Sequence, residues 1–109
     1  MGAWSVGIWE NDTALDVKGD FEAKLSEGQS KKSALINTID GWKNDDWEDA
    51  IYALAALQIE NNILVNKDII GKAIEYSAEK SDAEDYSNPK NREAVLESFH
   101  LSLQRFDKN

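Results

Sequence analysis

The segment from Trp47 to Leu57 limits the possible folds of this chain more than any other. Its apolar residues recur at i, i+3, i+4, i+7 and i+10, which is the spacing of one face of an α-helix. They are Trp47, Ala50, Ile51, Leu54 and Leu57. Additional alanines at positions 53, 55 and 56 widen this face. We therefore predict a helix from residue 45 or 46 to about residue 61, and we expect it to be the central and most buried one.

Four other helices are predicted from capping residues and apolar spacing. Asn, Asp or Ser can accept hydrogen bonds from the free N–H groups at a helix start, Gly commonly ends a helix, and Pro fits the first turn. A pair of asparagines, Asn61 and Asn62, separates the central helix from the next one. The expected helices run from Asn11 or Asp12 to Gly28, from Ser30 to Gly41, from Asp68 to about residue 80, and from Asn88 and Pro89 through Phe106.

The start of the chain has the pattern of an extended segment instead. Trp4, Val6 and Ile8 alternate with smaller residues, and no partner strand is recognisable elsewhere in the sequence. We therefore expect an extended arm that packs Trp4, Ile8 and Trp9 against the helices.

The length of 109 residues is that of one domain. We predict an all-α fold, a single compact domain of about five helices, with residues 1–10 as a short extended N-terminal arm and residues 11–109 as a helical bundle. The absence of Cys excludes disulfides, zinc–thiolate sites and Cys nucleophiles, and one His cannot form a multi-histidine metal site. We expect neither a metal nor a cofactor.

Acidic residues outnumber basic ones, with 21 Asp and Glu against 12 Lys and Arg and a net charge of −9. An excess of carboxylates repels phosphate groups, so nucleic acid and anionic membrane surfaces are poor candidates for partners. No basic and apolar targeting segment is recognisable at the start, and the longest apolar run, residues 50–57, is too short to cross a bilayer. We therefore expect a cytoplasmic protein.

The densest group of charges lies between Asp40 and Asp49, where five acids and one Lys fall together with two Trp. The spacing does not fit an EF-hand calcium loop, because a loop begun at Asp40 would place Trp42 at a ligand position. The helix dipole stabilises one or two acids at a helix start, but it does not explain five. We predict that this group contacts a basic protein partner, with Trp as its anchor. The candidate residues are Asp40, Trp42, Asp45, Asp46, Trp47, Glu48 and Asp49.

A second candidate surface lies in the polar segment 81–88, which we expect to be a loop. Its candidate partner-binding residues are Asp82, Glu84, Asp85 and Tyr86.

Two further patterns could carry chemistry. His100 could act as a general base, but no Ser lies in a Gly-x-Ser-x-Gly motif, and we favour a residue at the border of the core. Asp46-x-x-Asp49 and Glu79-x-x-Asp82 each place two carboxylates on one helical face, where facing pairs could hold Mg²⁺ against phosphates. This arrangement resembles the motif of the all-α nucleotide pyrophosphohydrolases, with Asp replacing both Glu of its first pair.

The first sixteen residues carry the most specific motif of the chain. Its matching positions are Gly2, Ala3, Trp4, Gly7, Glu10, Asn11, Asp12, Ala14 and Asp16. The motif resembles the N-terminal signature of a bacterial family, domain of unknown function 4259, although Ser5 and Trp9 stand where that signature has Gly and Phe. The resemblance implies no particular activity. We interpret Asn11 or Asp12 as a helix cap that Trp4 and Trp9 clamp.

Small, acidic, Cys-free bacterial domains without a catalytic motif resemble immunity proteins, which neutralise a cognate toxin by direct contact. The expected partner is a basic toxin, such as a nuclease, because an acidic surface can fill a phosphate site and speed the encounter. The alternatives are a Mg²⁺-dependent enzyme similar to the nucleotide pyrophosphohydrolases and a helical regulatory module.

Overall fold

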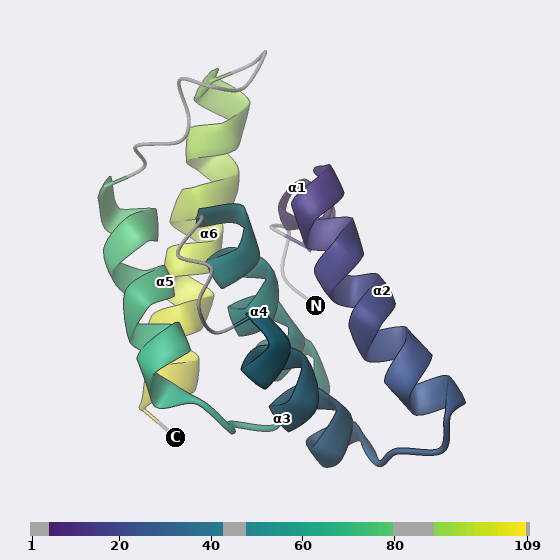
Figure 1. Cartoon of the computed structure of the whole chain (residues 1–109). Helices are drawn as coiled ribbons and strands as arrows, with labels where there is room; N and C mark the ends of the chain where they lie inside the picture. Colours follow the sequence, from purple (N-terminus) through teal and green to yellow (C-terminus); the bar gives the residue numbers. More distant parts are fainter. Residues whose placement is uncertain (1–4, 43–47, 80–88, 109) are drawn as a thin grey trace.

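The computed structural model describes residues 5–42, 48–79 and 89–108, and these residues form α-helices joined by short turns (Figure 1). This confirms the predicted all-α fold and its five helices of several turns each. None of the helices in the described part of the chain has the length and apolarity that crossing a lipid bilayer requires. The helices are α1 (Ser5–Ile8), α2 (Asp12–Ser26), α3 (Lys31–Trp42), α4 (Glu48–Asn61), α5 (Lys67–Glu79) and α6 (Pro89–Asp107).

Three predicted helix ends are confirmed by their hydrogen bonds or backbone angles. At the start of α2, the side-chain oxygen of Asn11 accepts a hydrogen bond from the Ala14 N–H at 2.8 Å. At the start of α3, the Ser30 hydroxyl accepts one from the Ser33 N–H at 3.1 Å. After α2, Gly28 has φ +96°, a left-handed conformation that Gly adopts without steric cost. Local chemistry therefore sets these boundaries.

Two predicted boundaries are wrong. The cap of α5 is Asn66, whose Oδ1 accepts from the Ile69 N–H at 3.0 Å, whereas the predicted cap, Asp68, lies inside the first turn. Helix α3 does not end at Gly41 but continues through it to Trp42. Gly within a helix costs only about 1 kcal/mol relative to Ala, so packing of the following Trp42 against the core can offset it.

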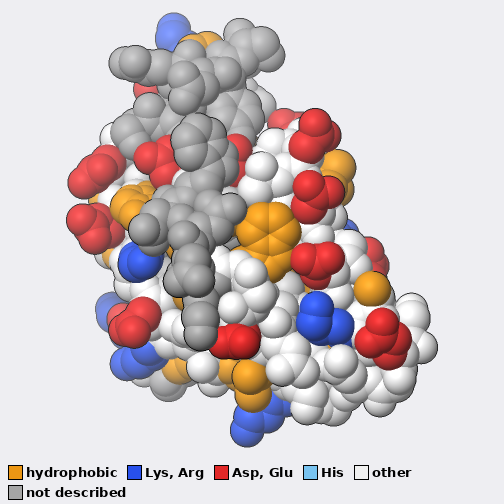
Figure 2. Space-filling view, viewed as in Figure 1, with side chains coloured by type: hydrophobic (Ala, Val, Ile, Leu, Met, Phe, Trp, Pro, Cys, Tyr) orange, Lys and Arg blue, Asp and Glu red, His pale blue; other side chains and the backbone are white. Residues whose placement is uncertain are grey.

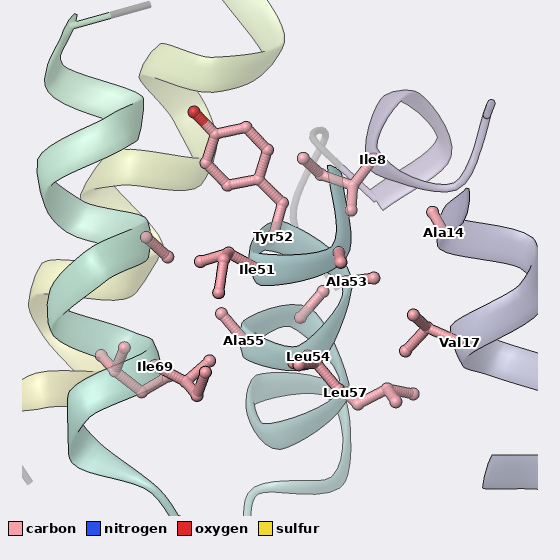
Figure 3. Close-up of a cluster of buried hydrophobic side chains, with 14 of the residues drawn as sticks. Ile8, Ala14, Val17, Ile51, Tyr52, Ala53, Leu54, Ala55, Leu57 and Ile69 are labelled. Atoms are coloured by element: carbon pink, nitrogen blue, oxygen red, sulfur yellow. The ribbon is translucent and has the colours of Figure 1, made fainter. Parts of the chain in front are cut away.

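The central helix is α4, as predicted, although the structure describes it only from Glu48 onward. Every residue from 50 to 58 is buried, and side chains from α1, α2 and α5 surround it (Figure 3). α1 and α2 lie on one side of α4, and α5 and α6 lie on the other (Figure 1). Gln58 is the polar member of this stretch, and its Oε1 accepts hydrogen bonds from the N–H groups of Val65 and Asn66, both at 3.0 Å. A core amide thus satisfies the backbone of the turn that leads into α5.

The N-terminal segment corrects the predicted extended arm, because Ser5–Ile8 form one turn of helix, α1. Ile8 is buried, as expected, while Trp4 lies outside the described residues. Gly7 lies directly against α6, where an added Cβ would be only 2.6 Å from Cγ2 of Val95. A segment of this length fits both an extended and a helical spacing, so contacts with distant helices decide its conformation.

Arg92 of α6 fixes α1 in place from inside the molecule. The residue is only 3% exposed, and its Nη1 donates to the Gly7 carbonyl at 3.2 Å. Its Nη2 forms an ion pair with Oδ1 of Asp49 at 3.4 Å, and its guanidinium lies 5.6 Å from the ring centre of Tyr52. One buried cation therefore joins α1, α4 and α6.

Candidate functional site

The structure describes four of the seven residues predicted to form the main partner-binding surface. Asp40 and Trp42 lie at the end of α3, and Glu48 and Asp49 lie in the first turn of α4. The others, Asp45, Asp46 and Trp47, lie outside the described residues, as do all members of the second candidate surface, Asp82, Glu84, Asp85 and Tyr86.

Trp42 connects the end of α3 to α2. The indole is half-buried and packs against the core, and its Nε1 donates to Oδ2 of Asp20 at 2.8 Å. Asp40, two residues earlier, is exposed. This hydrogen bond brings part of the predicted surface beside an acidic side chain of α2.

The outer side of α2 extends this acidic region along the helix. Asp12, Asp16 and Asp20 follow one another at i, i+4 and i+8, and all are exposed. Residues four apart are neighbours on a helix surface, and like charges there are destabilising by about 0.2–0.5 kcal/mol per pair. Figure 2 shows several acidic side chains on the α2 side of the molecule and others on the α5 side. We call Asp12, Asp16, Asp20 and Trp42 the acidic face. Asp40 lies elsewhere, beside Ile36, Val65 and Asn66.

The same side of α2 also carries an exposed apolar residue, Leu15, and a residue without a side chain, Gly19. Leu15 of α2 is 50% exposed, and a Cβ added at Gly19, on the same side of the helix, would meet no other atom within 4 Å. A helical Gly normally costs stability relative to Ala, and no contact within the described protein requires it here. The surface at Gly19 is therefore open to close approach by another molecule.

Of the two acids at the start of α4, Asp49 has an internal role. Its carboxylate pairs with the buried Arg92, and its side chain is 16% exposed. Glu48 is half-buried in the same turn, where a negative charge is favourable at the helix N-terminus. Among the described residues, the exposed acids nearest to Trp42 therefore lie on α2. The i, i+4, i+8 spacing of the three α2 aspartates was the sequence signal for this.

His100 lies at the border of the core, as the favoured interpretation predicts. Its Nδ1 is 2.8 Å from the Ser77 hydroxyl and 3.1 Å from the Ile74 carbonyl oxygen. The Ser77 hydroxyl donates to the same carbonyl at 3.1 Å and is fully buried. A Ser nucleophile must be reachable and must donate its proton to the His, so this pair does not have the geometry of a catalytic dyad.

The carboxylates that could hold Mg²⁺ are only partly described. Asp46 and Asp82 lie outside the described residues, and Asp49 is paired with Arg92. Within residues 5–42, 48–79 and 89–108, no three His, Asp or Glu side chains lie close enough together to bind one metal ion.

Comparisons of the chain with protein-family models, with curated proteins and with solved structures give no match. The resemblance of the first sixteen residues to the domain of unknown function 4259 family therefore stays a prediction.

Proposed function

We propose that this protein is a small cytoplasmic immunity protein that neutralises a basic bacterial toxin by direct contact through the acidic face. The observation that supports this most is the alignment of Asp12, Asp16 and Asp20 on the outer side of α2, joined to Trp42 by a 2.8 Å hydrogen bond. Three aligned negative charges and a neighbouring aromatic ring form a surface that a basic protein can cover.

Without a partner, the acidic face carries an electrostatic cost that a basic protein would remove. The aligned aspartates repel one another, and cationic side chains placed between them would remove that repulsion. Complementary charge also raises the rate of encounter, which benefits an inhibitor that must act before its target does. Trp42 supplies an aromatic group of the kind that dominates binding energy at interfaces.

Co-expression provides the test. Cells would produce the product of an adjacent gene that stops growth when expressed alone, together with wild-type protein or with the triple variant Asp12→Lys, Asp16→Lys, Asp20→Lys. We expect the wild-type protein to restore growth and the variant to fail. Circular dichroism and the melting temperature of the variant must first show that its helices are retained.

A matched control tests whether protection depends on the acidic face itself or only on the net charge of the protein. The triple variant Glu75→Lys, Glu79→Lys, Glu93→Lys changes three exposed acids of α5 and α6 and alters the net charge equally. We expect this control to protect cells as the wild-type protein does. Full protection by the α2 variant would refute the acidic face as the contact. Binding of Mg²⁺ and a nucleoside triphosphate by the wild-type protein, measured by calorimetry, would instead favour the enzyme alternative.

A further inference from the structure

A cleft of about 310 Å³ lies between α5 and α6. These two helices lie on the opposite side of α4 from α2 (Figure 1). Its described lining consists of Ser77, Ala78, Glu97, His100 and Leu101. Leu101 is 54% exposed, the largest exposed fraction of any large apolar residue in the described part of the chain. The cleft thus combines an exposed apolar wall with two titratable side chains.

The hydrogen bonds around His100 determine which ring nitrogen carries the proton. A carbonyl oxygen only accepts hydrogen bonds, so Nδ1 at 3.1 Å from the Ile74 oxygen must donate. The single proton of the Ser77 hydroxyl is used in its own bond to the same oxygen, which leaves Oγ to accept from Nδ1 at 2.8 Å. If Nδ1 carried no proton, its lone pair would face a lone pair of the Ile74 oxygen at 3.1 Å. Nδ1 therefore donates into the α5 backbone, and the ring is held in one orientation.

This assignment makes Nε2 of a neutral His100 a hydrogen-bond acceptor. Glu97 precedes His100 by three residues on α6, so the two side chains are neighbours on one helical face, and the Glu97 carboxylate also only accepts. Among the described lining residues there is no Lys or Arg, and the Ser77 proton is already used. The described side chains of the cleft therefore offer acceptors and a negative charge beside the apolar surfaces of Ala78 and Leu101.

We infer that this cleft binds a primary alkylammonium group. The ammonium donates hydrogen bonds to Nε2 of His100 and to the Glu97 carboxylate, and its methylene chain lies on Ala78 and Leu101. The same group occurs in a lysine side chain of a protein and in a free polyamine. The site is independent of the acidic face and would exist whether or not the protein inhibits a toxin.

The first measurement is the protonation state of His100 in the ligand-free protein. Long-range ¹H–¹⁵N correlation spectra at pH 8 distinguish a protonated from an unprotonated ring nitrogen by their chemical shifts. We expect a protonated Nδ1 and an unprotonated Nε2. A proton on Nε2 would make it a donor and would overturn the inference.

The second measurement is binding of small probes to the whole protein, followed by NMR titration. N-acetyl-lysine-methylamide and spermidine carry the ammonium group, while N-acetyl-norleucine-methylamide has the same chain without the charge. We expect both amines to shift the amide signals of residues around the cleft and the norleucine derivative to have no effect. Tighter binding of the lysine derivative would assign the site to a protein partner, and tighter binding of spermidine would assign it to a free polyamine. Equal shifts with the uncharged derivative would refute the site.

Two variants each remove one feature of the site, the Nε2 acceptor or the negative charge, while leaving the fold's contacts in place. His100→Asn keeps an amide N–H near the position of Nδ1, and so keeps the bonds to Ser77 and Ile74, but removes Nε2. Glu97→Gln removes the charge. Because hydrogen bonds to charged groups contribute strongly, we expect each variant to raise the dissociation constant of the amines at least about tenfold.

Glu93→Gln is the matched control, since Glu93 is an exposed acid one turn earlier on α6 that does not line the cleft. We expect it to bind the amines as the wild-type protein does. Unchanged binding by both His100→Asn and Glu97→Gln, or an equal loss in Glu93→Gln, would refute the inference.

Discussion

Gly7→Ala adds one methyl group between α1 and α6, where the structure has no room for it. The added Cβ would be 2.6 Å and 2.7 Å from the two γ-carbons of Val95. Favourable carbon–carbon contacts lie at about 3.5–4.0 Å, so Val95 or the whole of α1 must move by roughly 1 Å. Such overpacking costs about 1–3 kcal/mol, and the better helix propensity of Ala returns about 0.5–1 kcal/mol. We expect a net loss of about 1–2 kcal/mol in the free energy of unfolding.

Thermal and urea unfolding, followed by circular dichroism, would measure this loss. For a domain of this size, 1 kcal/mol corresponds to a change in Tm of roughly 4 °C, so we expect a decrease of about 4–8 °C. Gly19→Ala is the control, because Gly19 is also helical but has no atom within 4 Å of the added Cβ. We expect that variant to be more stable than the wild-type protein by about 0.5–1 kcal/mol.

Val95→Ala completes the test as a double-mutant cycle, because it removes both γ-carbons that the new methyl group would touch. In this background, Gly7→Ala should cost nothing or should stabilise the protein. An unchanged Tm for Gly7→Ala alone, or an equal cost in both backgrounds, would show that α1 does not pack against α6 as described.

Three other substitutions test the remaining structural arguments, each by urea unfolding. Asn66→Ala removes the side-chain cap of α5 and should cost about 0.5–2 kcal/mol, and a neutral result would contradict the assignment of the cap. Gly28→Ala should cost about 1–2 kcal/mol, because φ is +96° while the space around the residue is open; stabilisation would mean that the turn has another conformation. Asp49→Asn should cost up to about 3–5 kcal/mol, because it takes this carboxylate from the buried guanidinium of Arg92. A neutral result would contradict the structural role of Asp49.

The sequence predicted those helix ends and buried faces that depend on residues close together in the chain. Asn11 and Ser30 accept hydrogen bonds from N–H groups three residues later, so the residues that form these caps are adjacent in the sequence. The burial of α4 was predictable for a related reason, since its alanines and apolar residues leave no polar side to face water. In each case one short window of sequence contains both the cause and the effect.

Prediction from the sequence failed where contacts between residues far apart in the chain determine the structure. The conformation of α1 depends on Val95 and Arg92, and no pattern within four residues could reveal those contacts. The same applies to two residues of the predicted partner-binding surface. Asp49 has the sequence context of a surface acid in a charged turn, but the buried Arg92 of a distant helix takes its carboxylate. Trp42 meets Asp20 only because α2 and α3 pack side by side.

The contact between Gly7 and Arg92 also sets an order of events during protein synthesis. These residues are separated by 85 positions, so the ribosome completes α1 long before it makes the helix that holds it. At about 5–20 residues per second, the nascent N-terminal turn waits roughly 4–17 s for α6. During that interval Ile8 has no completed pocket, and a chaperone that binds nascent chains has access to it. The α1 turn therefore cannot complete its contacts before α6 has been made.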